Sequence, residues 1–241
     1  MNGQLILITG ESATGKSTSL MNIPNQERWA YLNTESGKSL PFKHKFRAAI
    51  VTDPYEVTAT IDQIAEAPQF DGVIIDSLTF LLDMYESLYI VGAKDGRQAW
   101  QNFAQYFKNM MQQSVAKAVN AGKHVVFLAH TKTEQDAALN DKTYVPVKGS
   151  LANQGIEAYF SVVVSTKRVG LDKLKDQDTA LCRLSEDDEI TGYKHVFQTR
   201  LTKETVGDRI RGPIGLFAKN QIYMDNDVAL LIDHMNKHFA N

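Results

Sequence analysis

Two glycines, a lysine and a serine stand near the N-terminus at a spacing that suits phosphate binding. The segment is Gly10-Glu11-Ser12-Ala13-Thr14-Gly15-Lys16-Ser17, which fits the P-loop pattern. Its glycines let backbone N–H groups approach phosphate oxygens closely, and the following helix N-terminus adds partial positive charge. Lys16 is expected to reach the β- and γ-phosphates, and the Ser17 hydroxyl is expected to ligate Mg²⁺. The segment therefore predicts a nucleoside triphosphate site, and a glycine-rich turn before a helix is the competing interpretation. We expect nucleotide contacts from Gly10, Glu11, Ser12, Ala13, Thr14, Gly15, Lys16, Ser17 and Thr18.

Three polar residues follow other apolar runs and could complete this chemistry. Asp76 ends the run Val73-Ile74-Ile75, where a carboxylate can hold Mg²⁺ beside the P-loop, although an aspartate there is also a common helix cap. Glu35 could position or deprotonate the attacking water if its strand neighbours the P-loop strand, and alone it could equally be a solvated loop residue. His130 could hydrogen-bond the γ-phosphate and report it to the next loop, or it could be satisfied by backbone groups.

The elements that would position these residues alternate between strands and helices. Apolar runs at residues 5–8, 73–75 and 125–129 predict short buried strands, and residues 29–33 and 48–51 predict two more short strands. Residues 16–22 are compatible with a helix after the P-loop, Asp53-Pro54 predicts a helix start for residues 55–67, and apolar spacing predicts a long helix over residues 97–121. This alternation predicts an α/β fold with a doubly wound, mainly parallel sheet.

The C-terminal half has a different pattern. Residues 160–164, 179–184 and 194–201 favour strands, with an acidic hairpin tip at residues 186–189, so an antiparallel extension of the sheet is expected. Asp225 or Asn226 is expected to cap a final helix that contains Val228, Leu231 and Met235. No domain boundary is evident, which predicts a single domain over residues 1–241.

Composition limits the classes of protein that the chain can belong to. Its 241 residues carry a net charge of −2, which argues against uniform electrostatic binding of DNA but allows a local basic groove. The single cysteine, Cys182, permits no internal disulfide and suits a reducing cytoplasm. No apolar run approaches the roughly 20 residues of a membrane span, and none resembles a signal peptide. We expect a cytoplasmic protein that does not interact with a membrane.

The order of these motifs resembles the RecA-type recombinase core. The resemblance spans about residues 4 to 218 and includes Thr34-Glu35, Val73-Ile74-Ile75-Asp76-Ser77 and Lys148-Gly149-Ser150-Leu151-Ala152-Asn153. Within this family, the chain most resembles the minimal RecA-like recombinases and single-strand annealing proteins of bacteriophages. It implies an ATPase that uses ATP and Mg²⁺, with Glu35 as the catalytic glutamate and Asp76 as the magnesium ligand. His130 stands where the family usually has a glutamine that senses the γ-phosphate.

The resemblance also implies two DNA-binding loops, at residues 86–99 and 131–150. Lysine and arginine suit phosphate contacts, and tyrosine can stack on bases. Both segments are long and polar, as functional loops often are. Ordinary surface loops are the competing interpretation. The candidate DNA-binding residues are Tyr89, Lys94, Arg97, Lys132, Lys142 and Lys148, with Tyr144 beside them.

Assembly is the last implication of the resemblance. In that family a basic residue reaches the nucleotide of a neighbouring subunit, and Arg200 and Lys203 are the candidates here, ahead of Arg209 and Arg211. A solvated arginine at a strand end is the alternative. The resemblance implies a homo-oligomer, as a ring or a filament, that binds single-stranded DNA. The chain starts directly at its first strand, without the oligomerisation arm of the larger recombinases, so a ring, a short oligomer or a partner-dependent assembly is open beside a family-style filament. A single-strand-binding protein is a candidate loading partner in the host cytoplasm.

Three other functions compete with DNA-dependent recombination or annealing. A P-loop ATPase that acts on a protein partner would be stimulated by that protein and indifferent to DNA. A small-molecule kinase would be expected to carry an arginine-rich lid, and no such cluster is evident. A GTPase would need an Asn-Lys-x-Asp segment, which the sequence lacks.

Overall fold

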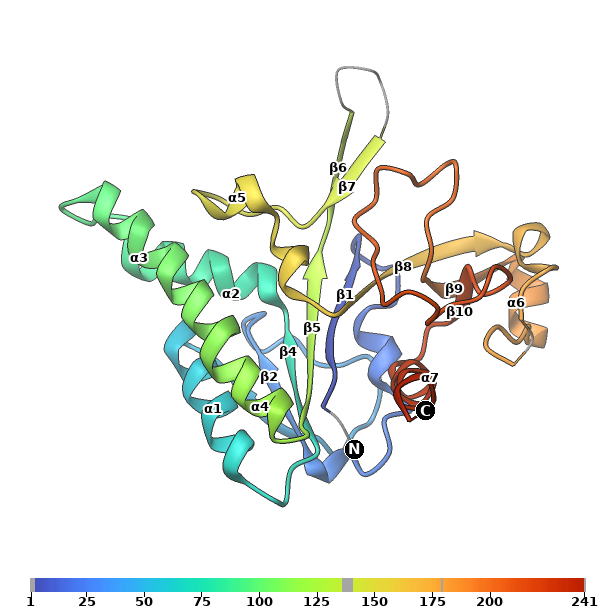
Figure 1. Cartoon of the computed structure of the whole chain (residues 1–241), viewed down its shortest axis with the longest axis horizontal. Helices are drawn as coiled ribbons and strands as arrows, with labels where there is room; N and C mark the ends of the chain where they lie inside the picture. The colour runs from blue at the N-terminus through green and yellow to red at the C-terminus, as the bar shows by residue number, and fades with distance from the viewer. Residues whose placement is uncertain (1–2, 136–140, 179, 241) are drawn as a thin grey trace.

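A single twisted sheet forms the centre of the molecule (Figure 1). The computed structural model describes residues 3–135, 141–178 and 180–240. Within these residues the sheet has eight strands in the order β10-β9-β8-β1-β5-β4-β2-β3. Their bounds are β1 Leu5–Gly10, β2 Trp29–Asn33, β3 Arg47–Ile50, β4 Gly72–Asp76, β5 His124–His130, β8 Val162–Gly170, β9 Tyr193–Gln198 and β10 Tyr223–Asp225. Every pairing from β8 to β3 is parallel, and β9 and β10 add antiparallel strands beside β8.

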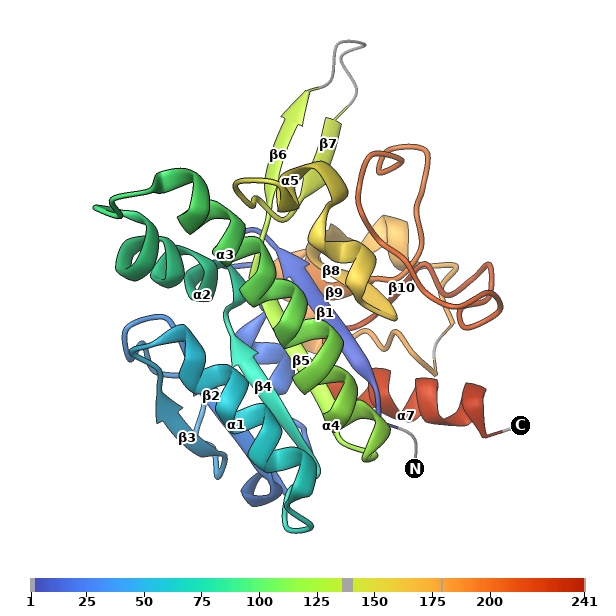
Figure 2. The ribbon, with the colours of Figure 1, turned by 60° about the vertical axis from the view of Figure 1, so that its left-hand side comes forward.

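Helices cover both faces of this sheet, as its apolar strands require. One face packs against α1 (Pro54–Glu66), α2 (Leu78–Tyr85), α3 (Gly96–Asn109) and α4 (Ala116–Asn120), which lie together in Figure 2. The other face packs against the 3₁₀ turn Ser17–Leu20 and α7 (Val228–Phe239). Parallel strands buried on both faces are typical of α/β folds. The predicted fold class, a mainly parallel sheet with antiparallel strands in the C-terminal half, is therefore confirmed.

The helices next to the sheet follow their sequence signals closely. Asp53 caps α1 by accepting a hydrogen bond from Tyr55 N at 2.8 Å, and Pro54 occupies the first position. The predicted long helix is present as one continuous helical segment from Gly96 to Asn120. Its middle part, Met110–Val115, is π-helical and joins α3 to α4. Asp95 rather than Arg97 marks its beginning, because the Asp95 side chain accepts from Gln98 N at 3.0 Å.

Several predicted elements are wrong. The helix expected over residues 16–22 is only the 3₁₀ turn Ser17–Leu20. The acidic run is α6 (Glu186–Thr191) rather than a hairpin tip, because Ser185 and Asp188 form a capping box. No strand occurs over residues 180–184, the described part of the strand expected at 179–184. The final helix is capped by Asp227, whose carboxylate accepts from Ala229 N and Leu230 N, and not by Asp225 or Asn226.

A β-hairpin projects from the sheet edge at which the parallel strands end. It consists of β6 (Lys132–Gln135) and β7 (Asp141–Tyr144), and both ribbon views show it extending away from the body (Figures 1 and 2). After it come the short helix α5 (Leu151–Gln154) and β8. In the described chain, no helix has both the length and the apolar character needed to cross a membrane.

Candidate nucleotide-binding site

The P-loop lies between the end of β1 and the 3₁₀ turn that starts at Ser17. Lys16 folds back into it, and Nζ donates to Gly10 O at 2.9 Å and to Glu11 O at 2.7 Å. The Lys16 side chain is buried, and burial lowers its pKa to about 8 despite the nearby carboxylates Asp76 and Glu35. The loop thus holds a desolvated cation at the place where phosphates are expected.

Asp76 faces the P-loop from the end of β4. Its Oδ2 accepts from Ser17 Oγ at 3.0 Å and from the Tyr31 hydroxyl at 2.8 Å. Burial raises the pKa of Asp76, and the two hydrogen bonds oppose that rise. A serine hydroxyl beside a carboxylate supplies hard oxygen atoms, the kind of ligand that Mg²⁺ prefers. Ser17 and Asp76 therefore fit the predicted metal role, and Mg²⁺ bound there would neutralise charge on the phosphates.

Glu35 and His130 meet beside Lys16. His130 Nε2 lies 3.2 Å from Glu35 Oε1, and His130 Nδ1 lies 3.4 Å from Lys16 Nζ. Because an ammonium group only donates, the tautomer with hydrogen on Nε2 satisfies both contacts. The hydrogen bond from His130 is the main reason that the pKa of Glu35 falls to about 2, and Lys38 adds to the effect. Glu35 is consequently a carboxylate over the working pH range.

The route by which Glu35 reaches the site differs from the expectation. Its strand, β2, does not neighbour the P-loop strand, since β5 and β4 lie between β1 and β2. Glu35 still reaches the P-loop because β1, β5, β4 and β2 are parallel and all end at one edge of the sheet. Asn33 Oδ1 accepts from Glu35 N at 2.9 Å and fixes the turn after β2.

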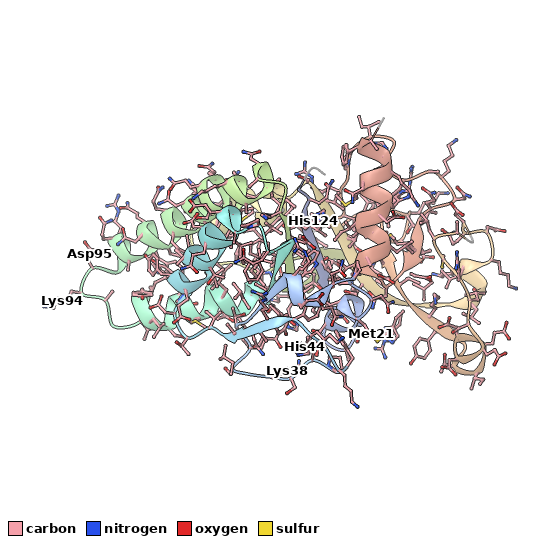
Figure 3. All side chains as sticks on the ribbon, turned by 90° about the horizontal axis from the view of Figure 1, so that it is seen from below. Met21, Lys38, His44, Lys94, Asp95 and His124 are labelled. Carbon is pink, nitrogen blue, oxygen red and sulfur yellow. The ribbon has the colours of Figure 1, made fainter. Side chains whose placement is uncertain are left out.

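These residues line one cavity of about 450 Å³. It contains the candidate residues Lys16, Ser17, Asp76, Glu35 and His130 together with others that sequence reasoning missed. The missed residues include Tyr31, Lys38, His195 and Asn226. Tyr31 has a sequence signal, its place two residues before the end of a predicted strand, but His195 and Asn226 have none, because they come from distant segments. The Lys38 side chain lines this cavity and is largely exposed, and Figure 3 labels it near the margin of the molecule.

Comparison with known families agrees with this geometry. A family model described as "AAA domain" matches residues 2–207, which include β1, the P-loop, Asp76 and His130. The chain therefore belongs to this AAA-domain family and is a nucleotide-binding P-loop ATPase, a class that typically uses Mg²⁺. A search of curated proteins returned no match.

The first candidate DNA-binding segment is mostly helical rather than a loop. Residues Glu86–Ile90 extend α2 as a π-helical turn, and Gly96 begins α3, so only residues 91–95 connect the two. The Tyr89 hydroxyl donates to Asp53, whereas Lys94 and Arg97 are exposed. Lys94 lies at the far end of this helical pair, distant from the cavity-lining residue Lys38 (Figure 3).

The second segment contains the β6–β7 hairpin instead of an irregular loop. Lys132 pairs with Glu134 at 2.5 Å, and Lys148 pairs with Glu86 at 2.5 Å. Lys142 Nζ lies 5.5 Å from the centre of the Tyr144 ring. Residues 136–140 of this segment are outside the described residues.

The residues expected to act on a neighbouring subunit lie away from the cavity of their own chain. Arg200 follows β9, which ends at Gln198 rather than at residue 201, and its Nη1 donates to Phe217 O at 2.5 Å. Lys203 is exposed in the next turn. Arg209 and Arg211 donate to Glu157 Oε2 at 3.2 Å and to Ala158 O at 3.1 Å.

Proposed function

We propose that this ATPase binds single-stranded DNA along the hairpin edge of its sheet and promotes recombination or strand annealing, as RecA-like phage proteins do. The observation that carries the proposal is the direct connection between the nucleotide site and the β6–β7 hairpin. His130 ends β5 inside the cavity, and β6 begins two residues later at Lys132. The strand order, in which β5 separates the P-loop strand from the Asp76 strand, is compatible with a RecA-like core.

Thr131, the residue between β5 and β6, is hydrogen-bonded to the P-loop. Thr131 N donates to Gly10 O at 3.2 Å, and Gly10 O also accepts from Lys16 Nζ at 2.9 Å. A nucleotide that draws Lys16 onto its phosphates changes the partners of Gly10 O and hence the anchor of the hairpin. Lys16, which binds the phosphates, and Thr131, which leads into the hairpin, donate to the same carbonyl oxygen, Gly10 O. This shared acceptor gives ATP a physical route to a DNA-binding element.

The hairpin also has the side chains that a single strand requires. Lys142 and Arg209 lie over Tyr144, with Arg209 Cζ 5.9 Å from the ring centre. Cationic groups around an aromatic ring can neutralise phosphates while the ring stacks on a base. Backbone hydrogen bonds join β7 to the segment after β9, from Thr143 N to Gly207 O and from Arg209 N to Thr143 O, both at 3.2 Å. The two segments therefore offer one continuous surface.

The test is ATP hydrolysis by the purified chain with and without single-stranded DNA, at low and moderate salt. We expect stimulation that weakens as salt rises, because phosphate contacts release counterions. Hydrolysis that ignores DNA, together with no DNA binding at low salt in the presence of ATP, would refute the proposal.

Two matched lysine variants test whether the β6–β7 hairpin is part of the DNA-binding surface. Lys132→Ala and Lys237→Ala each remove the cation of an exposed ion pair, one on the hairpin and one on α7. Exposed pairs contribute little to stability, so both variants should fold like the parent chain. Lys132→Ala should weaken DNA binding and lower its salt slope by about 0.7, the value per phosphate contact on single strands. Lys237→Ala should change neither quantity, and equal effects would remove the hairpin from the proposal.

Assembly is part of the same proposal. We infer a homo-oligomer, ring or filament, in which Arg200 or Lys203 reaches the nucleotide of the next subunit, because neither residue lines the cavity of its own chain. Mixing inactive Lys16→Ala chains with Arg200→Ala chains tests this directly. Recovered hydrolysis would support a contribution across subunits, and additive loss would contradict it. A single-strand-binding protein as loading partner can be tested in the same assay.

Action on a protein partner is the second candidate. Three of the proposed DNA-binding side chains, Lys132, Lys148 and Tyr89, already have acidic partners in the chain. Stimulation of hydrolysis by a host protein, without any response to DNA, would favour this alternative.

A further inference from the structure

Two side chains from the C-terminal half hold the backbone of the P-loop. His195, in β9, places Nδ1 2.9 Å from Thr14 O. Asn226, between β10 and α7, places Nδ2 2.8 Å from Gly15 O. Carbonyl oxygens only accept hydrogen bonds, so both side chains donate. Neither residue belongs to the P-loop pattern, and Asn226 lies beyond the residues that the family model matches.

The two carbonyls control the direction of two N–H groups. The Thr14–Gly15 and Gly15–Lys16 peptides are trans, since the only cis peptide in the described chain is Asp76–Ser77. In a trans peptide the C=O and N–H bonds point in opposite directions. A carbonyl held toward His195 or Asn226 therefore turns the N–H of Gly15 or Lys16 the other way. Backbone N–H groups of this loop are the donors that a phosphate needs.

We propose that His195 and Asn226 form a P-loop clamp, a pair of positioning residues that keeps these N–H groups aimed at the β- and γ-phosphates. The packing around Gly15 agrees with this role. Gly15 has a φ of +102°, and a Cβ there would lie 2.6 Å from Asn226 Nδ2 and 3.3 Å from His195 Nδ1. Any side chain at this position would displace the clamp, so the second glycine of the motif is required by what packs on it as well as by its own φ.

The clamp gives the antiparallel extension a function. β9 and the turn before α7 must dock on the sheet for His195 and Asn226 to reach the loop. A neighbouring contact, Asn22 Nδ2 to Asp227 Oδ2 at 2.8 Å, joins the segment after the P-loop to the cap of α7. Nucleotide binding is therefore coupled to the docking of the C-terminal strands and helix.

The experiment compares binding of ATP with binding of inorganic triphosphate by calorimetry. This inference rests only on the nucleotide-binding part of the proposed function and is independent of DNA. If the clamp orients the phosphate-binding N–H groups, His195→Ala and Asn226→Ala should each weaken both ligands by the same factor, about five- to tenfold for one hydrogen bond. Weaker binding of ATP alone would mean that the residues contact the nucleoside, and it would overturn the clamp.

Conservative variants separate positioning from folding. His195→Asn keeps a donor near the position of Nδ1 and should restore most of the affinity. Asn226→Asp places a carboxylate against Gly15 O and should weaken binding more than Asn226→Ala. The controls are His238→Ala in the last turn of α7 and Asn220→Ala, which is exposed. Thermal unfolding without ligand verifies that each variant is folded.

The outcomes are distinct. Parental affinity for both ligands in His195→Ala and Asn226→Ala would refute the clamp and leave the proposed ATPase untouched. If the parent chain bound neither ATP nor triphosphate, both the clamp and the proposed ATPase would be refuted. Loss of affinity in His195→Ala without rescue by His195→Asn would also count against the clamp, because the donor alone would then not explain the effect.

Discussion

Nucleotide binding should make Lys16 take up a proton. In the free protein its ammonium group is buried, its hydrogen-bond partners among the described residues are the carbonyls of Gly10 and Glu11 and the His130 ring, and burial lowers its pKa to about 8. A triphosphate brings several negative charges to the same place. Opposite charge favours the protonated amine, so the pKa of Lys16 should return to its ordinary range in the complex.

The size of the effect follows from the two pKa values. With about 8 in the free protein and about 10.4 or more in the complex, uptake should be roughly 0.1 proton per bound nucleotide at pH 7, 0.5 at pH 8 and 0.9 at pH 9. Because binding takes up a proton, linkage also sets the direction in which affinity changes with pH. Binding should be strongest below pH 8 and should weaken, by up to about tenfold per pH unit, as the pH rises from 8 toward 10.

Calorimetry in two buffers of different ionisation enthalpy measures this uptake. Titrations at pH 8 and pH 9 are the informative ones, because phosphate groups with a pKa near 6 are then already ionised. Lys16→Arg is the matched control, since a guanidinium remains protonated at every pH used. Equal uptake in the parent and in Lys16→Arg, or no uptake by the parent at pH 9, would refute the reasoning.

Four further predictions concern the same site and its support. Glu35→Gln should bind ATP normally but hydrolyse it at least about 100-fold more slowly, and full turnover would place the base elsewhere. Asp76→Asn should lose the tightening of ATP binding by Mg²⁺, measured as the ratio of Kd values with and without the ion. The hydrogen bond from His130 lowers the pKa of Glu35 to about 2, so its stabilisation is present above the ordinary pKa and lost as the pH falls to about 2. The difference in unfolding free energy between the parent and His130→Ala should therefore shrink over that range, and a difference independent of pH would contradict the pair. Leu231→Ala, in the buried face of α7, should cost about 2–5 kcal/mol in urea unfolding.

Local signals in the sequence predicted most of the sheet. Runs such as Val73-Ile74-Ile75 become strands buried on both faces, and Asp53-Pro54 starts α1, because each signal depends on neighbours within a few residues. The failures have two causes. The acidic run forms α6 because Ser185 and Asp188 make a capping box, a local signal that the hairpin interpretation overlooked. Most of residues 86–99, and residues 132–135 and 141–144, form helices or paired strands through packing that no local window contains.

By itself, the sequence determined the phosphate-binding chemistry of this protein. Gly10 to Ser17 specify their own role because a P-loop is local, and Asp76, Glu35 and His130 could be selected because parallel strands end at a common edge. Only the tertiary structure decided how these groups are joined. It places β5 and β4 between β1 and β2, pairs His130 with Glu35, and brings His195 and Asn226 onto the P-loop from about 180 and 210 residues away. Contacts over such separations depend on strand order and packing, and no spacing along the chain encodes them.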